Sequence, residues 1–310
     1  MPTSPRLRGI VPPLITPLTS GEDLDRPALA RLVDHVLRGG VHGLFVLGTT
    51  GEGPGLSEAK RREVVTLVCA EVRERLPVLV SITDTIYEES VALACHAAEV
   101  GATAVVVAPP YYFPASQSEL TAYFRRLAAA IPLPFYLYNL PSLTKVSIGE
   151  EVVRRCLDLP NCRGLKDSSG DLSYFKRMQH IVGQSDTHSL FIGPEELLAE
   201  SLLAGGDGGI AGGANAWPEL YTAIFENASR GNWAEAQRAQ RRVLDISRRI
   251  YSIGGYGATV TKALKASLAA MGICGPTLAA PHLGWDEGER AALYEQLIGL
   301  GLLDYAAEER

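Results

Sequence analysis

The sequence has no basic segment of the kind that binds polyanions. Its 310 residues include 29 Lys and Arg against 35 Asp and Glu, for a net charge of -6, and acidic residues interleave the basic ones. Nucleic acids and anionic membrane surfaces attract clustered cations, so neither is an expected partner. A small anionic substrate needs only a few local donors and is compatible with this composition.

Cysteine is also scarce, and its spacing excludes two kinds of scaffold. No C-x-x-C pair occurs, and no repeat combines Cys and His at metal-ligand spacing, which argues against a zinc site and against a disulfide framework. We therefore expect no metal and no other cofactor. The five cysteines are Cys69, Cys95, Cys156, Cys162 and Cys274.

Long apolar runs are absent as well. Nothing approaches the roughly 18 consecutive apolar residues of a membrane span. The first 17 residues, MPTSPRLRGIVPPLITP, lack the continuous apolar core of a secretory signal. Since the cysteines also form no framework, we expect a cytoplasmic protein with reduced thiols.

Short β-branched runs that alternate with helical patterns are the main positive feature. Hydrophobic residues make up 46% of the chain, which is enough to bury a large core. Most strand-like runs are apolar on both faces, as parallel strands between two layers are. The eight runs are GIVPPLIT (9–16), GLFVLG (43–48), PVLVSIT (77–83), ATAVVVAPP (102–110), PFYLYN (134–139), CRGLK (162–166), SLFIG (189–193) and GGIAGG (208–213).

Eight strand-helix units in about 230 residues favour a (β/α)8 TIM barrel over an open doubly wound sheet. The open sheet remains the competing fold. Its usual glycine-rich first turn is missing, because the first turn here is rich in proline, and GGDGGIAGG (205–213) does not have the G-x-G-x-x-G spacing. After residue 230 only amphipathic helices are predicted, over 232–253, 259–272 and 286–303. We therefore expect a barrel domain at 1–230 and a C-terminal helical domain at 231–310.

Polar side chains stand at the predicted carboxyl ends of several strands, where the active site of such a barrel lies. Thr49 and Thr50 follow the second strand, Tyr112 follows the fourth, Tyr138 ends the fifth and Lys166 ends the sixth. Taken singly, each has an ordinary structural explanation, such as turn formation or amphipathic packing. Together they resemble the apparatus for imine chemistry with a 2-oxo acid.

The chemistry needs an amine nucleophile, a proton carrier and a carboxylate site. An unprotonated amine is the attacking form, and an apolar surrounding disfavours charge on Lys166. Tyr138 can move protons during imine formation and C–C cleavage. The GTTGE loop offers hydroxyls and backbone N–H groups for a carboxylate.

Five motifs now show a family resemblance. GTTGE, PPYY, YNLPS, GLKDSSGD and GGDGGI occur in the order and approximate spacing of the dihydrodipicolinate synthase and N-acetylneuraminate lyase family of Schiff-base (class I) aldolases. The resemblance covers essentially the whole chain. It implies a (β/α)8 barrel with a C-terminal helical domain, assembled as a homo-oligomer that is usually a tetramer, a dimer of dimers.

The resemblance also implies catalytic roles. Lys166 matches the imine-forming lysine and Tyr138 the tyrosine that transfers protons. Thr49 and Tyr112 match the hydroxyl relay partners of that tyrosine. Tyr112 lies in PPYYFP, which resembles the family segment that reaches into a neighbouring subunit's site.

Further matches concern binding of the substrate. Thr49 and Thr50 match the carboxylate-binding pair, and Ile210 matches the strand-eight position whose backbone approaches the pyruvyl group. Ser168 is a candidate to bind hydroxyls of a longer substrate. So is the segment GPEE, which begins at Gly193.

One departure from the family pattern bears on the substrate. Synthases that condense pyruvate with aspartate semialdehyde resemble YNVPSRTG, with an Arg two residues after the Pro, whereas this chain has YNLPSLTK with Leu143 at that place. The two-pronged carboxylate clamp of an Arg is therefore missing. Lyases of sialic acid also carry Leu there, and their acidic segment resembles Glu195 and Glu196, although Gly212 stands where they tend to have Ser.

These features favour a lyase that uses pyruvate and a small aldehyde, cleaving or forming a 2-oxo-3-deoxy sugar acid. A dihydrodipicolinate synthase or a dehydratase would use the same imine and remains an alternative. A 2-oxo acid binding protein without turnover is a third hypothesis. The combination of Lys166, Tyr138 and Thr49 argues against it.

Overall fold

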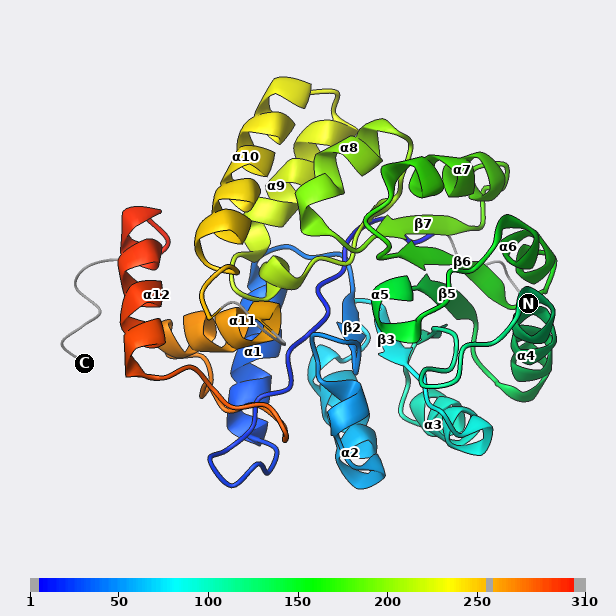
Figure 1. Ribbon diagram of the computed structural model, residues 1–310, viewed down its shortest axis with the longest axis horizontal. Helices are drawn as coiled ribbons and strands as arrows, with labels where there is room; N and C mark the ends of the chain where they lie inside the picture. The colour runs from blue at the N-terminus through cyan, green and yellow to red at the C-terminus, as the bar shows by residue number, and fades with distance from the viewer. Residues whose placement is uncertain (1–5, 255–258, 304–310) are drawn as a thin grey trace.

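Eight short strands run parallel in a single sheet, each hydrogen-bonded to its neighbours in the order β1-β8-β7-β6-β5-β4-β3-β2. The computed structural model describes residues 6–254 and 259–303 (Figure 1). Neighbours in the sheet are mostly consecutive in sequence, as right-handed βα repeats require. The strands are β1 Gly9–Ile10, β2 Leu44–Val46, β3 Val78–Ser81, β4 Ala104–Val107, β5 Phe135–Asn139, β6 Cys162–Asp167, β7 Ser189–Ile192 and β8 Gly208–Gly209.

The segment after β1 closes the sheet against β2. Phe45 N–H donates to Pro12 O at 3.0 Å, Leu14 N–H donates to Phe45 O at 2.8 Å, and Pro13 forms a parallel bridge with Phe45. The predicted (β/α)8 barrel is confirmed. The first strand is shorter than the predicted run GIVPPLIT, because two consecutive prolines have no N–H to donate to the ladder.

A layer of helices surrounds the strands (Figure 1). Polar side chains begin several of these helices: Asp25, Ser57, Ser116 and Asp171 each accept a hydrogen bond from the backbone of the first turn, and Ser116 forms a complete capping box with Glu119. The helices of this layer are α1 Arg26–Arg38, α2 Glu58–Val72, α3 Tyr87–Glu99, α4 Gln117–Ala130, α6 Glu150–Leu157, α7 Leu172–Val182, α8 Leu198–Leu203 and α9 Pro218–Ser229.

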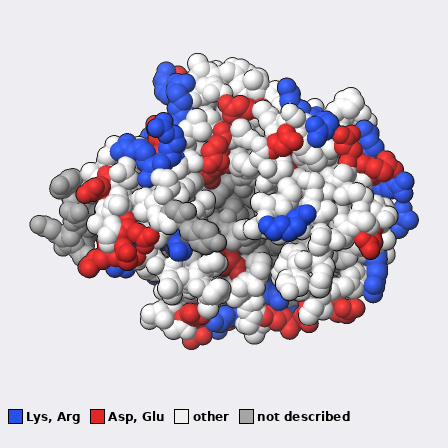
Figure 2. All heavy atoms as spheres, in the orientation of Figure 1, with Lys and Arg blue, Asp and Glu red and all other residues white. Residues whose placement is uncertain are grey.

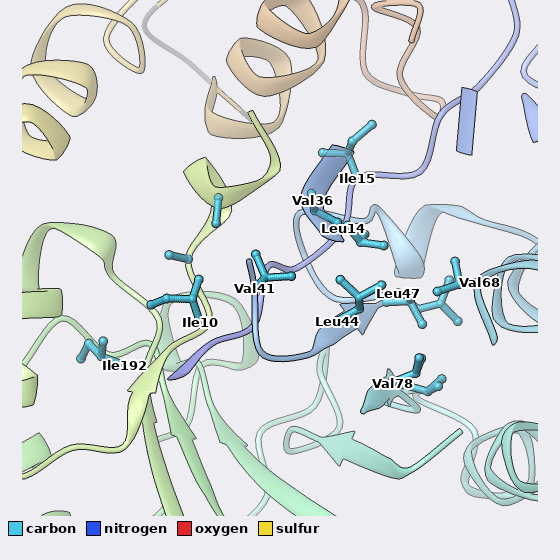
Figure 3. Packing of buried hydrophobic residues seen from close by; sticks show 14 of the residues in the cluster. Ile10, Leu14, Ile15, Val36, Val41, Leu44, Leu47, Val68, Val78 and Ile192 are labelled. Atoms are coloured by element: carbon cyan, nitrogen blue, oxygen red, sulfur yellow. The ribbon is translucent and has the colours of Figure 1, made fainter. Parts of the chain in front are cut away.

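Two apolar cores fix this arrangement. The larger lies between strands and helices, and Figure 3 shows part of it where the first segment, α1 and β2 meet. The smaller contains Phe45, Leu79, Val106, Tyr138 and Phe191, which come from five different strands. Alternate residues of a strand point to opposite faces, so Tyr138 shares its side of the sheet with this second cluster.

Short helices follow several strand carboxyl ends and were not separated in the sequence prediction. They are η1 Gly53–Gly55, α5 Pro141–Thr144, η2 Glu195–Leu197 and η3 Gly212–Asn215. Each lies in a βα connection, which is where barrels of this kind place their functional residues.

Three further helices follow the barrel, as predicted. They are α10 Trp233–Arg249, α11 Thr259–Ala270 and α12 Glu287–Gly299. Helix α10 packs along α9, while α11 contacts η3 and α12 (Figure 1). The domain boundary predicted at residue 230 falls in the turn between α9 and α10 and remains a prediction. Within the described residues, no helix is both long and apolar enough to cross a membrane.

Candidate active site

Nearly all of the predicted site residues line one cavity at the carboxyl ends of the strands. The cavity measures about 240 Å³. The molecular face drawn in Figure 2 is hollowed near its middle, with charged side chains of both signs around it. The cavity-lining residues that the sequence predicted are Thr49, Thr50, Tyr138, Lys166, Ser168, Gly193, Glu195, Glu196 and Ile210.

A second cavity, of about 270 Å³, shares Thr49 and Tyr138 with the first. Its wall is largely apolar and includes Leu47, Leu140 and Leu143. Because both cavities meet at Thr49 and Tyr138, a substrate held beside these two residues can extend in either direction. A larger groove of about 490 Å³ lies near the C-terminal end of α2 and the start of β3, and none of the predicted site residues lines it.

Lys166 is buried, with 4% of its surface exposed. It stands directly opposite Tyr138 in the β5–β6 register. Its Nζ lies 3.6 Å from the centroid of the Tyr138 ring and 5.5 Å from that of Phe45. In the described residues no carboxylate forms an ion pair with Lys166. The amine therefore faces aromatic rings and hydroxyls, a setting suited to nucleophilic attack on a carbonyl.

Tyr138 is in position to exchange protons with its neighbours. Its hydroxyl lies 3.4 Å from Thr49 Oγ1. Burial alone raises the pKa of Tyr138, but Lys166 and the hydroxyls of Thr49 and Ser168 outweigh it, so the pKa is lowered from its ordinary value. A phenol that gives up its proton more readily is suited to general acid and base catalysis.

The loop that carries Thr49 and Thr50 is held rigidly. Gly53 packs so closely that a Cβ there would lie 2.0 Å from Leu47 O, and Thr16 Oγ1 donates to Gly51 O at 2.7 Å. Thr49 itself is exposed. The loop therefore presents hydroxyls to the cavity from a fixed backbone.

Glu52 attaches this loop to the C-terminal helices. The Glu52 carboxylate forms a buried ion pair with Lys265 of α11 at 2.5 Å and accepts a hydrogen bond from Ala279 N at 2.7 Å. Lys265 also donates to Thr277 O at 2.6 Å. Lys265 was not predicted as a site residue, although a lysine on the apolar face of an amphipathic helix is a usable signal.

Both carboxylate oxygens of Glu195 already accept hydrogen bonds from the protein, which the sequence did not indicate. Its Oε1 accepts hydrogen bonds from Tyr221 (2.6 Å) and Tyr251 (2.8 Å), and its Oε2 accepts one from Gly213 N (2.7 Å). Burial raises the pKa of Glu195 despite these bonds. Glu196 accepts from Ser247 at 2.6 Å through Oε1, and among the described residues none donates to its Oε2. Glu196 is therefore better placed than Glu195 to receive a substrate hydroxyl.

Tyr112 and Leu143 lie outside the first cavity. Tyr112 is 80% exposed with a left-handed backbone, and its ring packs against Phe113. Its neighbour Tyr111, which stands at the same strand end but was assigned no role from the sequence, lines the second cavity instead. Leu143 is half exposed on α5 at the edge of that cavity. Within one chain, then, Tyr112 does not reach Tyr138.

No metal-binding cluster is found within residues 6–254 and 259–303. The side chains that line the cavity present amine, phenol, hydroxyl and carboxylate groups. A (β/α)8 barrel with a buried lysine and tyrosine side by side at its mouth defines the class: a pyruvate-dependent, Schiff-base-forming lyase. The chain belongs to the dihydrodipicolinate synthetase family, whose model matches residues 6–298.

Several known proteins are similar along nearly their full length. The solved dihydrodipicolinate synthase of Bacteroides thetaiotaomicron is 43% identical with a TM-score of 0.93, over 96% of this chain and 99% of that one. YagE of Escherichia coli, solved in complex with pyruvate, is 30% identical with a TM-score of 0.90, over 95% and 99%. A DapA-like lyase of Halobacterium salinarum is 36% identical over 96% of this chain and 95% of its own. The family predicted from the five motifs is confirmed.

Proposed function

We propose that the protein is an aldolase that cleaves, or in reverse forms, 2-oxo-3-deoxy sugar acids through an imine between Lys166 and pyruvate. The observation that carries this proposal is the buried Lys166 amine, 3.6 Å from the Tyr138 ring and in the same cavity as Thr49 and Thr50. YagE, a pyruvate-bound relative, is named as a putative 2-dehydro-3-deoxy-D-gluconate aldolase.

The proposed reaction divides into four steps. The Lys166 amine adds to the C2 carbonyl of the substrate, and Tyr138 gives a proton to the leaving hydroxyl, so that water departs and the protonated imine forms. The Tyr138 phenolate, in contact with Thr49, then takes the proton of the C4 hydroxyl. The C3–C4 bond breaks, the aldehyde leaves, and the electron pair of that bond converts the imine to an enamine. Protonation at C3 and hydrolysis release pyruvate and restore Lys166.

The binding roles follow from the lining of the cavity. Thr49 and Thr50 present hydroxyls for the substrate carboxylate, and Ile210 brings a strand-end backbone to the same cavity. Hydroxyls of the sugar chain can meet Ser168 and Glu196. Charge-assisted hydrogen bonds of about 1.5 to 3 kcal/mol each are enough to set a preference for such substrates.

A covalent test addresses the nucleophile. Incubation with pyruvate and borohydride should leave one reduced pyruvyl group on Lys166, because reduction traps the imine. Peptide mass mapping locates the adduct. Lys176, exposed on α7, serves as the matched control: Lys176→Ala should be trapped like the wild type, and Lys166→Ala should not be. An active enzyme with unmodified Lys166 would contradict the mechanism.

A turnover test addresses the substrate class, and it rests on Leu143. Aspartate semialdehyde brings a second carboxylate, and leaving a charge unpaired in the site costs several kcal/mol. Leu143 cannot pair with it, and Lys145 Nζ is engaged with Ser142 O at 2.7 Å. We expect efficient pyruvate release from polyhydroxylated 2-oxo acids and poor condensation with aspartate semialdehyde.

The comparison is kcat/KM for both substrate classes in the wild type and in Leu143→Arg. The Arg variant should gain condensation activity relative to cleavage. The synthase hypothesis has its own support, since the Bacteroides relative is named a dihydrodipicolinate synthase. If the wild type condenses aspartate semialdehyde efficiently and the Arg variant gains nothing, the synthase function replaces the aldolase.

We also propose that the protein assembles as a homo-oligomer, a tetramer built as a dimer of dimers. Tyr112 and Phe113 are each 80% exposed, and such adjacent aromatic rings are typical of surfaces that a partner covers. In this assembly Tyr112 reaches the Thr49 and Tyr138 of a second copy and completes the hydroxyl relay. Sedimentation at assay concentration measures the state; a fully active monomer would refute it.

A further inference from the structure

The two residues that follow the catalytic pair in the chain are themselves a pair. Tyr138 stands opposite Lys166, and Asn139 stands opposite Asp167. Alternation along a strand sends Asn139 and Asp167 to the face away from the barrel interior. Both side chains are fully buried, and neither lines either cavity of the site.

The pairing register of β5 and β6 changes along the strands, so the register at their start does not determine these two pairs. Phe135 pairs with Cys162, but Leu137 pairs with Leu165, so β6 carries one extra residue just before the catalytic level. Gly164 occupies this irregularity with φ +131°, and a Cβ there would lie 1.9 Å from Ser189 O. A slip of one residue would turn Lys166 out of the barrel interior. Something must therefore hold the register beyond the bulge.

The side chains of Asn139 and Asp167 form a direct link there. Asn139 Nδ2 donates to Asp167 Oδ1 at 2.8 Å. The remaining groups are also paired: Ile148 N donates to Asn139 Oδ1 at 3.0 Å, and Ser169 donates through N and Oγ to the two oxygens of Asp167, each at 3.0 Å. A buried network in which each polar side-chain atom has at least one partner favours one arrangement of the chain.

The main chain of the same two residues supports the cavity wall. Ser168 N donates to Asn139 O at 2.8 Å, and Gly193 N donates to Asp167 O at 2.7 Å. Ser168 and Gly193 both line the cavity. The pair thus connects the catalytic strands to two substrate-facing positions.

Burying these polar side chains costs free energy, and a purely structural contact between β5 and β6 would not need them. Burial raises the pKa of Asp167, although Asn139 and Ser169 oppose the shift by hydrogen bonding. An apolar pair of similar volume often stabilises a core as well or better, and buried polar links are instead associated with specificity of register.

We propose that Asn139 and Asp167 are positioning residues, whose hydrogen bond locks β5 and β6 in the register that brings Tyr138 against Lys166. The inference rests on the proposed function, since the reaction of Lys166 with pyruvate reports the alignment. Two isosteric substitutions at this one hydrogen bond separate the link from the charge. Asn139→Asp replaces the donor with an acceptor and breaks the link. Asp167→Asn keeps an acceptor toward Asn139, while it removes the charge and places an amide nitrogen beside Ser169 Oγ.

In Asn139→Asp we expect kcat to fall by about 100-fold, the size of effect that a misplacement near 1 Å produces, with a smaller change in KM. The rate of borohydride trapping by pyruvate should fall with kcat. Asp167→Asn should retain much more of both. The double variant Asn139→Asp/Asp167→Asn exchanges donor and acceptor, so that the amide on β6 donates to the carboxylate on β5, and it should recover part of the loss. If Asn139→Asp does not fold, Asn139→Ala removes the donor without adding charge and takes its place.

A folded Asn139 variant with kcat and trapping rate within about threefold of the wild type overturns the proposal, since ~0.7 kcal/mol is no loss of register. A loss of kcat and trapping rate in Asp167→Asn that equals the loss in Asn139→Asp also overturns the proposal. The pKa of Tyr138 can be measured without substrate from its ¹³C resonance in labelled protein. The resonance is assigned by its absence in Tyr138→Phe. Loss of the link should raise the pKa of Tyr138 by separating it from Lys166. If the wild type itself gives no pyruvyl adduct, the proposed function fails while this titration still tests the positioning.

Discussion

At the scale of single residues, the closeness of Tyr138 and Lys166 is the central feature of the site. The Nζ of Lys166 lies over the Tyr138 ring, and the Tyr138 hydroxyl faces Thr49. Charge on Lys166 and hydrogen bonds to the phenol oxygen stabilise the phenolate against the cost of burial. Lys166 and these hydrogen bonds thus lower the pKa of Tyr138.

This coupling predicts the pH dependence of the enzyme. A lowered pKa means that Tyr138 loses its proton at a lower pH than an ordinary tyrosine, whose pKa is about 10. Steps in which the phenol gives a proton are lost as the pH rises through that value. We expect kcat/KM to decline on the alkaline side before an ordinary tyrosine would titrate, and Tyr138→Phe to lower kcat by about 10²- to 10⁴-fold and remove this limb.

The matched control is Tyr136→Phe. Tyr136 lies on the same strand, and burial raises its pKa to about 12. Its loss should leave the alkaline limb in place. A limb that moves in Tyr136→Phe, or persists in Tyr138→Phe, would show that another group controls the profile.

Sequence motifs were sufficient to predict which residues at the strand ends form the site. They were insufficient to predict the hydrogen-bond partners of those residues. Lys166, Tyr138 and Thr49 come together because parallel strands end at the same edge of the barrel. Saturation of Glu195 could not be predicted, because Tyr221 and Tyr251 reach it from helices far along the chain. No local pattern encodes which tyrosine will meet which carboxylate.

At the scale of elements, the order of strands and helices could be predicted from the periodicity of hydrophobic residues. The lengths of these elements depend on which backbone groups can form hydrogen bonds. The predicted run GIVPPLIT keeps only two ladder residues because of its prolines. The segment PEELLAESLL after β7 divides into η2 and α8. Its first turn bends toward the cavity and carries the two glutamates. Deviations from regular structure are concentrated where the chain forms the site.

The loop after β2 illustrates how one element depends on another. Glu52 and Lys265 are both buried, and burial lowers the pKa of Lys265 while Glu52 opposes the shift. Lys265→Met should cost about 3 to 5 kcal/mol of unfolding free energy, because it leaves the Glu52 charge uncompensated. It should also raise KM for pyruvate, since Thr49 and Thr50 belong to the same loop.

The double variant Glu52→Gln/Lys265→Met serves as the control for that prediction. Removing both charges should recover much of the stability, as replacement of buried ion pairs commonly does. Urea unfolding measures the free energies, with KM determined in parallel. A Lys265→Met protein within about 1 kcal/mol of the wild type would show that the pair stabilises little.

At the scale of the whole molecule, the C-terminal helices take part in the site. Tyr251, at the end of α10, and Val260, on α11, line the cavity. Lys265 holds the loop that carries Thr49 and Thr50. Composition and periodicity predicted these helices as an appendage. Their contribution depends on contacts between segments more than 50 residues apart, such as Tyr251 with Glu195, which differ by 56 positions.

The proposed hydroxyl relay beyond Thr49 depends on Tyr112. Tyr112 is exposed, with φ +82°, a strained backbone conformation for a bulky side chain. Such strain is retained where surroundings or function require it. If a second copy supplies these surroundings, each site uses Lys166 from one chain and Tyr112 from another.

Mixing two inactive variants tests this arrangement directly. Lys166→Ala has no nucleophile, and Tyr112→Phe has no relay hydroxyl. In a mixed dimer, the site in the Tyr112→Phe chain keeps its own Lys166 and receives Tyr112 from the Lys166→Ala chain. Random reassortment at equal amounts gives mixed dimers about half of the time, each with one complete site, so about a quarter of wild-type activity should return.

The control is a mixture of Lys166→Ala with Tyr138→Phe, because the exchange of Tyr112 makes no complete site there. Lys166 and Tyr138 come from the same chain, so each site lacks one of them, and no activity should return. Subunits are mixed in mild denaturant and diluted, and kcat is measured against each variant alone. Recovery in the first mixture only would show that Tyr112 acts across subunits. Equal behaviour of the two mixtures would place its function, if any, within one chain.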